Sequence, residues 1–447
     1  MRRFVILALL FGAMQLVLPL GAAGHGSKWL LTFGFLILAA YSVGELAVLV
    51  KLPKITGYLA AGVVFGPSLF NTVTTEAISE LGPVSSLAIG LIAYLAGAEL
   101  RWQEVRKRGA TIMKILTAEM VLGFVALSAV LWALGSRVPF LEGTSGSSRL
   151  AFAVLFGAVA IVHSPAVVMA LLSETRAGGP VARTTLGVVL VSDVVVVILF
   201  SAMLAMTRAV VPATGANVEG VSLASMVWEL GGAVIVGALL GGAVALYLRF
   251  VKHELVLFAI VVAFFGMVIA HMVHVETLLA LLTAGFVTEN LSRHEDGEAI
   301  RHAMERSAAP VFVVFFALAG AEMGLREVAG YWPLLIPIVL VRTGAIWAGT
   351  RAGVRWAGAP PETRRVWMGL VPQAGVAIGL AAAIAQAYPV RGTQMQTLFL
   401  AVVAINQVIG PILFRFALNR GNEIVSGSGS PTPAEPHPAL DAPRPAA

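Results

Sequence analysis

The chain has 447 residues, of which 58% are hydrophobic and 12% are charged, whereas soluble domains carry about 25% charged residues. This composition excludes an ordinary water-soluble globular protein and indicates a polytopic membrane protein. Cysteine is absent, which excludes disulfides, thiol nucleophiles and thiolate metal sites. The net charge of +6 is explained by membrane topology, so no nucleic-acid partner is expected.

Apolar segments suited to membrane-spanning helices follow one another along the chain. They cover residues 4–20, 29–50, 55–70, 84–98, 110–135, 150–173, 185–207, 222–248, 254–272, 275–291, 308–322, 333–350, 366–388 and 395–415. If the N-terminus is cytoplasmic and the segments alternate, most Lys and Arg residues fall on the cytoplasmic side, as the positive-inside rule requires. We therefore predict a multi-pass protein of a cell membrane, with the bacterial inner membrane expected and the C-terminus cytoplasmic.

The two ends of the chain differ from the rest. Residues 1–23 combine Arg2 and Arg3, an apolar run and small residues up to Ala23, which suits either a cleaved signal peptide or an extra helix. The tail 426–447, rich in Gly, Ser, Pro and Ala, is predicted to be a disordered cytoplasmic segment. The predicted fold between them is all-α, with about 13 transmembrane helices in one membrane domain over residues 29–418.

Two pairs of short motifs indicate an internal repeat. The stretch 59–64 (LAAGVV) resembles 282–287 (LTAGFV), and 95–100 (LAGAEL) resembles 318–323 (LAGAEM), both at an offset of 223. We therefore predict two repeats of five helices, 55–207 and 275–415. The second starts from the opposite side of the membrane, so the repeats are inverted, as in many secondary transporters with a midplane site.

The fourth segment of each repeat contains a proline inside an apolar run, at Pro165 and Pro372. Proline removes a helical hydrogen bond and clashes with the preceding turn. Interrupted helices at membrane depth are tolerated where they line a cavity, and their free carbonyls suit a monovalent cation. We therefore predict broken helices at His163-Ser164-Pro165 and at Pro372-Gln373.

A few charged residues lie inside the apolar segments. Asp193 stands in the middle of segment 185–207, where a carboxylate costs about 2.5–3.5 kcal/mol on insertion scales and is by default part of an ion or proton path. Arg342 is the repeat counterpart of Glu119, and we predict that the two form a structural ion pair. The counterpart of Asp193 is Gln407, at an offset of 214, so only the first repeat keeps a titratable group there.

Each of these residues also has a plainer interpretation. Asp193 could pair structurally with Arg342, Glu119 could face Lys114, and His163 could be a polar filler of the broken helix. Glu99 and Glu322 lie at segment ends, where a carboxylate reaches water, and Glu45 and Glu229 receive no role.

A further trio has a metal-like spacing: His271, His274 and Glu276. These residues fall in an extracellular turn between segments, for which we predict a solvated loop. The helical motif of two histidines and an adjacent glutamate base is absent. An intramembrane zinc enzyme is therefore the weakest of the functions considered.

The chain resembles the monovalent cation:proton antiporter-2 family, which includes the Kef-type transporters and Na⁺/H⁺ exchangers, over about residues 29–418. The resemblance rests on six features: the motif 52–67 (LPKITGYLAAGVVFGP), the run 95–99 (LAGAE), Ser164-Pro165, Asp193, Arg342 and the run 369–373 (GLVPQ). It implies two crossing broken helices, an essential aspartate after Asn, Asp or Gln, and a basic residue three helices before the end. It also implies a homodimer with an elevator-like motion.

Two departures from the family pattern are informative. Ser192 precedes Asp193, where electrogenic members have a second Asp, and His163 stands where Thr or Ser is common. A serine cannot titrate and an arginine stays protonated. We therefore expect Asp193 to exchange one proton for one cation, which is electroneutral.

The leading hypothesis is secondary antiport of Na⁺ or K⁺ against H⁺, with Asp193 as the shared site for proton and cation. Ser192, Ser164 and His163 are predicted to complete the site. No cofactor, no enzymatic activity and no metal beyond the transported cation are expected. The alternative is a cation channel or a gated K⁺ efflux pathway.

Overall fold

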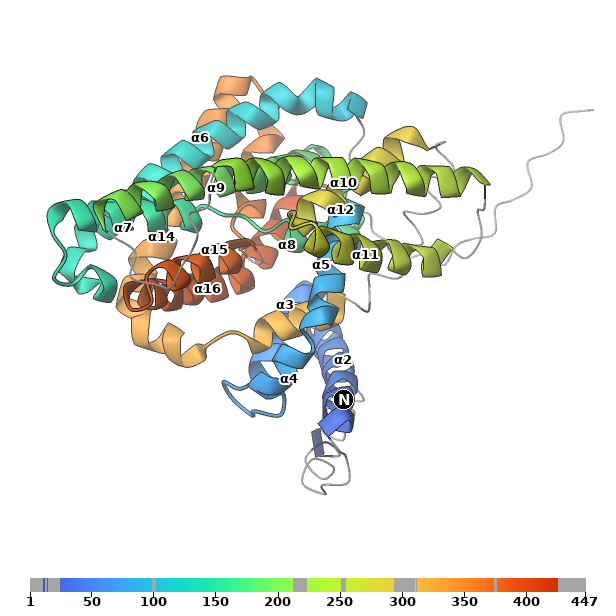
Figure 1. The fold of residues 1–447 in the computed structure, drawn as a ribbon, viewed down its shortest axis with the longest axis horizontal. Coiled ribbons are helices and arrows are strands. Elements are labelled where there is room, and N and C mark those ends of the chain that lie inside the picture. The colour runs from blue at the N-terminus through green and yellow to red at the C-terminus, as the bar shows by residue number, and fades with distance from the viewer. Residues whose placement is uncertain are drawn as a thin grey trace, which may run out of the picture.

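The computed structural model describes residues 25–98, 102–211, 223–250, 255–292, 312–373 and 376–424, together with 11, 12, 14 and 310. These residues form helices and connecting segments without any strand (Figure 1). Seven of the described helices are long and apolar enough to cross a membrane, and four shorter apolar helices accompany them. The predicted signal segment, apart from residues 11, 12 and 14, and the tail 426–447 lie outside the described residues.

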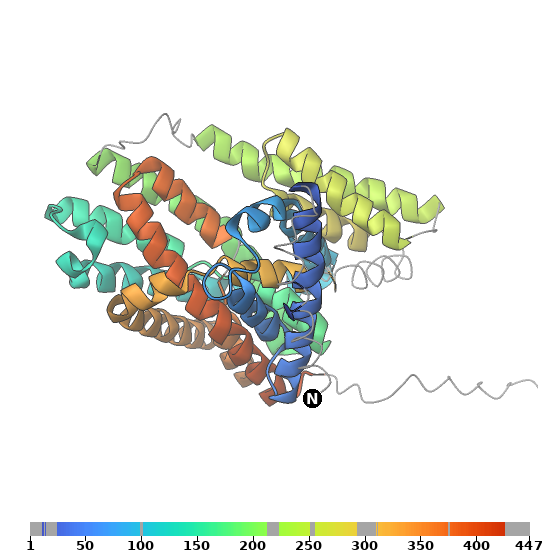
Figure 2. The same cartoon turned by 90° about the horizontal axis from the view of Figure 1, so that it is seen from below.

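Each apolar segment predicted from residue 29 onward corresponds to a helix or to a helix interrupted once. The helices pack into two groups, which Figures 1 and 2 show from two directions. We call the first the flanking bundle; it contains α2 (His25–Leu49), α3 (Lys54–Phe65), α4 (Thr75–Glu80), α5 (Gly82–Ala98), α10 (Leu223–Phe250), α11 (Leu255–Met272), α12 (Thr277–Leu291) and the helix Phe312–Ala321.

The second group, which we call the core bundle, carries the candidate site. It contains α6 (Trp102–Leu134), α7 (Gly146–Ala160), α8 (Pro165–Thr175), α9 (Pro180–Val210), α14 (Leu325–Ala357), η3 (Pro361–Gly369), α15 (Val376–Ala387) and α16 (Arg391–Arg420). Between the bundles, the main described contacts are those of α5 and α3 with α8 and of α3 with α16. These contacts form the described part of the interface between the bundles.

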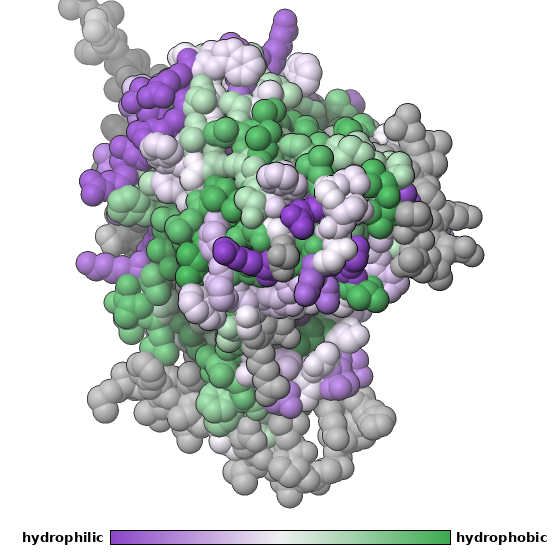
Figure 3. All heavy atoms as spheres, turned by 90° about the vertical axis from the view of Figure 1, so that its left-hand side faces the viewer, coloured by the Kyte–Doolittle hydropathy of each residue, from purple (hydrophilic) through white to green (hydrophobic). Residues whose placement is uncertain are grey.

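The outer surface is largely apolar. In the face shown in Figure 3, hydrophobic side chains cover a wide area. Exposed apolar residues stand along the outer helices, among them Leu239 and Phe250 of α10 and Trp332 and Leu340 of α14. Soluble monomers rarely expose apolar patches larger than a few hundred Å². This surface suits contact with lipid.

Glycines allow the flanking helices to cross closely, and their contacts come in pairs. A methyl group on Gly62 would lie 1.9 Å from the carbonyl oxygen of Ala317, and one on Gly285 would lie 2.0 Å from that of Tyr94. Gly285 is 223 positions after Gly62, and Ala317 is 223 positions after Tyr94. The reciprocal glycines repeat the pattern, with Gly97 against Leu282 and Gly320 against Leu59.

In the core bundle, α6 and α14 form the most extensive helix pair. Gly349 lies against the backbone of Glu119, and Gly353, four residues later, lies against that of Ile115. Small residues at this spacing let two membrane helices approach closely. The approach places Glu119 and Arg342, one on each helix of the pair, deep inside the bundle, where they are 0% and 1% exposed.

Both proline motifs interrupt a helix, as predicted. The α7 helix ends at Ala160, and α8 begins at Pro165, which needs no N–H donor at this position. Ser164 caps α8 by accepting a hydrogen bond from the amide of Val167 at 3.2 Å. The second interruption lies between η3 and α15, where residues 371–373, including Pro372, are not helical. Both interruptions leave backbone carbonyls without helical partners.

Candidate functional site

The guanidinium of Arg342 binds both helix interruptions. Its Nε donates to the carbonyl oxygen of Ala160 at 2.7 Å, and Nη2 donates to that of Val162 at 2.9 Å. Its Nη1 donates to the carbonyl oxygen of Val371 at 2.8 Å, with a longer contact from Nη2 to Leu370 at 3.5 Å. The positive charge thus lies at the C-terminal ends of α7 and η3, where the helix dipole is negative. Arg342 joins the two broken helices through their free carbonyls.

His163 makes a second link between the interruptions. Its Nδ1 lies 2.7 Å from the carbonyl oxygen of Leu370, and its Nε2 lies 3.1 Å from Oε2 of Glu119. Because a carbonyl only accepts, Nδ1 carries a proton, and a second proton must lie between Nε2 and the Glu119 carboxylate. Both side chains are fully buried. The pair is therefore neutral overall, whichever partner holds that proton.

An amide pair completes the crosslinks. The side chain of Gln373 donates from Nε2 to the carbonyl oxygen of Ala160 at 3.0 Å, and its Oε1 accepts from Nδ2 of Asn406 at 2.8 Å. Asn406 on α16 was not singled out by the sequence analysis. The signal available was its position, as an amide that directly follows the apolar run 398–405 and precedes Gln407. Gln373 was predicted as part of the second broken helix, and it also contacts the first one through Ala160.

Asp193 lies at the centre of α9 and is 8% exposed. Neither of its carboxylate oxygens has a hydrogen-bond partner in the part of the chain that the structure describes. Its neighbour Ser192 donates from Oγ to the carbonyl oxygen of Val189 on the same helix, at 2.7 Å. Since α9 packs against α7, α8 and η3, this unpartnered carboxylate belongs to the helix that adjoins both interruptions.

The structure corrects the predicted ion pair of Glu119 and Arg342. Glu119 contacts His163, and the hydrogen bonds of Arg342 go to backbone carbonyls instead. Asp193 does not pair with Arg342 either. The physical reason is that the interrupted helices present several free carbonyls, which satisfy a guanidinium without any carboxylate.

The predicted ligands beside Asp193 are also engaged elsewhere. Ser164 caps α8, Ser192 binds its own helix, and both ring nitrogens of His163 have partners. The structure thus brings His163, Arg342 and Gln373 together around the crossing of the broken helices. It leaves Asp193 as the unpartnered acidic group of α9.

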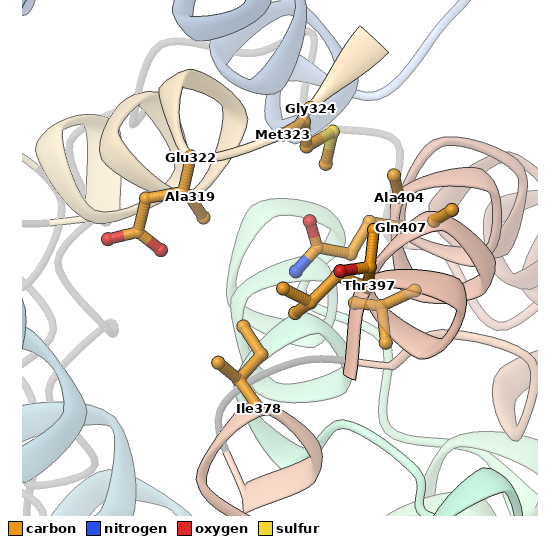
Figure 4. A pocket seen from close by; sticks show the side chains of 11 residues that line it. Ala319, Glu322, Met323, Gly324, Ile378, Thr397, Ala404 and Gln407 are labelled. Carbon is orange, nitrogen blue, oxygen red and sulfur yellow. The ribbon is translucent and has the colours of Figure 1, made fainter. Parts of the chain in front are cut away.

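A pocket of about 230 Å³ opens between the two bundles (Figure 4). Its walls are the end of the helix Phe312–Ala321 with Glu322, Ile378 of α15, and the stretch of α16 from Thr397 to Gln407. The amide of Gln407 points into the open space, and Glu322 lies on the opposite wall. The pocket therefore reaches from the end of one helix to the middle of α16.

The opposite side of the bundle interface is held by polar contacts. The carboxylate of Glu174, at the end of α8, accepts from the backbone N–H of Lys54 at 3.0 Å and lies 3.8 Å from Nη1 of Arg415. Arg415 also donates to the carbonyl oxygen of Leu52 at 2.7 Å. Lys54 forms an ion pair with Glu45, which gives this previously unassigned glutamate a partner.

Glu423 makes one more contact that sequence analysis missed. Its two carboxylate oxygens accept from the backbone N–H groups of Val181 and Ala182, each at 2.8 Å. It therefore caps the first turn of α9 from a position just beyond α16. A carboxylate at a helix N-terminus is favoured by both the free N–H groups and the dipole.

The metal-like trio lies in a turn, as predicted. His271 lies in the last turn of α11, His274 lies between the helices, and Glu276 caps α12 by accepting from the amide of Leu279. Both histidines are exposed. Within the described residues, no group of three potential ligands is arranged to hold a metal ion.

Comparison with known proteins adds the family to this geometry. The profile of the family described as "Sodium/hydrogen exchanger, transmembrane" matches residues 7–420. The chain belongs to this family. It is accordingly a multi-pass membrane protein of a transporter family.

Curated relatives are more distant. The exchanger is 22% identical over 401 residues to the ammonium/H⁺ antiporter subunit AmhT of Alkalihalophilus pseudofirmus, covering 88% of this chain and 94% of that one. It is 22% identical over 284 residues to the probable Na⁺/H⁺ antiporter 3 of Methanocaldococcus jannaschii, covering 62% and 67%. It is 30% identical to the iron transporter MagA of Paramagnetospirillum magneticum over 191 residues, which is 42% of this chain and 41% of that one.

Solved structures share the fold. The sodium proton antiporter MjNhaP1 of Methanocaldococcus jannaschii at pH 8 matches with a TM-score of 0.63 and 17% identity, over 87% of the exchanger and 95% of that chain. A structure from an electron-microscopy map of the same antiporter gives a TM-score of 0.68 over 90% and 98%. At this identity the likeness concerns the fold alone.

Proposed function

We propose that the protein exchanges a monovalent cation, Na⁺ or K⁺, for H⁺, with Asp193 as the site that both occupy in turn. One observation carries the assignment. Asp193 is buried at mid-helix with neither carboxylate oxygen partnered, whereas Arg342 and His163 have partners in the same bundle and Glu119 has one through Oε2. Leaving a buried polar group unpaired costs about 1–3 kcal/mol, and more for a charge. A proton or a bound cation removes that cost.

Competition at one carboxylate couples the two ions. The protonated form is favoured by burial, while the ionised form needs a cation to compensate its charge. If the carboxylate must hold either a proton or a cation, its exposure cannot easily switch from one side of the membrane to the other while the site is empty. Two relatives, the ammonium/H⁺ antiporter subunit AmhT and the probable Na⁺/H⁺ antiporter 3, support this class of exchange.

We also propose the wider architecture that the sequence predicts, namely two inverted repeats, a homodimer and a cytoplasmic C-terminus. The repeat is supported by the glycine contacts, whose partners are shifted by the same 223 positions as the sequence motifs. A twofold relation between the repeats would make each crossing occur twice. The interruptions in α7–α8 and η3–α15 follow the same arrangement.

The test is ion flux in proteoliposomes with a pH-sensitive dye. Each alkali cation and ammonium is added in turn to wild-type protein, to Asp193→Asn, and to the control Glu229→Gln, which alters an exposed carboxylate on α10. We expect Asp193→Asn to abolish cation-dependent proton movement while the protein still inserts, and the control to behave as wild type. Normal exchange by Asp193→Asn would overturn the assignment. Uncoupled cation leakage through it would favour a channel.

A further inference from the structure

The pocket between the bundles contains a buried amide without a partner. Gln407 is 2% exposed, and its side chain has no hydrogen bond to any other residue that the structure describes. Figure 4 shows the amide directed into the open space of the pocket. The amide therefore depends for its hydrogen bonds on water or on a ligand in the pocket.

A carboxylate faces the same space. Glu322 follows the helix Phe312–Ala321 directly, its side chain is solvent-accessible, and it lies on the wall opposite Gln407. The other lining side chains are small or apolar, except Thr397. The hydroxyl of Thr397 donates to the carbonyl oxygen of Thr393 at 2.9 Å. The polar groups free to meet an occupant are therefore one carboxylate and one amide.

Both polar residues of the pocket have counterparts in the first half of the chain. Gln407 corresponds to Asp193 at the offset of 214, and Glu322 corresponds to Glu99 at the offset of 223. The pocket thus joins the second-half counterparts of two first-half carboxylate residues, Asp193 and Glu99. In the orientation predicted from the positive charges, the pocket opens on the side away from the cytoplasm.

We propose that Glu322 and Gln407 form a second binding site for the transported monovalent cation, which loads the protein from the non-cytoplasmic side. A single carboxylate and an amide oxygen suit a singly charged cation, since hard cations take oxygen ligands. Divalent and transition metals would need further carboxylates or imidazoles, which the pocket walls do not supply. The identity of the bound ion rests on the proposed function, cation/proton exchange. The site collects the cation before transfer to Asp193.

The transport test compares the two sides of the membrane. Oriented proteoliposomes are assayed for the half-saturating concentration of Na⁺ or K⁺ on each side. We expect Glu322→Gln to raise it roughly fivefold on the pocket side only, the effect of losing one accessible charge contact. Glu229→Gln, which removes an exposed carboxylate of α10 outside the pocket, should leave both sides unchanged. Equal changes on both sides, or none, would overturn the proposal.

A binding test separates this site from the exchange itself. The thermal unfolding midpoint of purified Asp193→Asn is measured with NaCl, KCl or NH₄Cl against choline chloride at equal ionic strength. We expect cation-dependent stabilisation to persist in Asp193→Asn and to disappear when Glu322→Gln is added. Absence of stabilisation in Asp193→Asn, or its persistence in the double variant, would refute the second site. Absence of exchange by wild-type protein would instead refute the proposed function.

Discussion

Arg342 performs the work that backbone amides perform in an unbroken helix. Four carbonyl groups at the two interruptions accept hydrogen bonds from the guanidinium. Arginine presents five N–H groups in a rigid planar fork, while lysine presents three on a flexible stem. The charge alone is therefore not sufficient at this position.

The first prediction concerns this geometry. Arg342→Lys should lower the thermal unfolding midpoint markedly, because at least one charge-assisted hydrogen bond worth about 1.5–3 kcal/mol is lost. Arg355→Lys, an exposed change on the same helix, is the matched control and should have little effect. The measurement is unfolding in detergent followed by intrinsic fluorescence. Equal midpoints for the two variants would show that charge is what matters.

The neutral pair of His163 and Glu119 gives the second prediction. Glu119→Gln and His163→Asn should each destabilise the protein, and the double variant should lose less than the sum of the two losses. Directly contacting residues typically show coupling of about 0.5–3 kcal/mol. The measurement is a double-mutant cycle in thermal unfolding. Additive losses would mean that the 3.1 Å contact contributes no interaction energy.

At the residue scale, the sequence alone indicated the candidate polar residues but not the groups that they contact. Asp193 was evident as a carboxylate inside an apolar run, and the two prolines were evident as helix breakers. The pairing of Glu119 with Arg342 was wrong because it relied on charge complementarity between repeat positions. Free carbonyls are created by the fold, and a sequence does not display which of them meet in space.

At the scale of elements, the main feature is the close crossing of helices in the flanking bundle. Gly62 on α3 and Gly285 on α12 occupy corresponding positions, and each lies against the backbone of another helix. A β-carbon at either place would overlap a carbonyl oxygen, so the helices would have to separate. These crossings hold the flanking bundle together where lipid gives no hydrophobic driving force between helices.

The third prediction is therefore symmetric. Gly62→Ala and Gly285→Ala should reduce thermal stability by similar amounts, typical of overpacking at about 1–3 kcal/mol. Gly344→Ala on α14, where an added methyl group meets nothing within 4 Å, should be neutral or slightly stabilising. Unfolding midpoints of the three variants decide the matter. A large loss in only one of the first two would contradict the proposed repeat.

Helix positions were predictable because membrane segments are recognised by their length and apolar composition. The exact ends were less so: α6 begins at Trp102 and α14 extends from Leu325 to Ala357, both beyond the predicted apolar runs. These extensions carry charged residues that hydropathy excludes from a span. The division into two bundles depends on long-range packing and was not predicted.

At the scale of the whole molecule, the charge carried per cycle follows from the site. In the proposed mechanism, Asp193 releases one proton for each cation bound, Arg342 stays protonated, and the proton of the His163–Glu119 pair is held between two buried partners. No net charge then crosses the membrane. The two concentration gradients alone would drive transport.

The fourth prediction tests this count. Exchange in proteoliposomes is measured with the membrane potential held at zero and then imposed with an ionophore for a cation that the protein does not carry. We expect the initial rate and the end-point to be the same in both conditions. A rate that follows the imposed voltage would show that a second titrating group moves with Asp193.

The contact of Glu423 with the start of α9 has a mechanical consequence for the whole core bundle. The last turn of α16 lies at the end of the second half of the chain, and α9 closes the first half. The carboxylate fastens these two helices at one end, so that a displacement of α9 pulls the end of α16 with it. A truncation that removed residue 423 would take away the acceptor of the first-turn N–H groups of α9 and so release this helix from the end of α16.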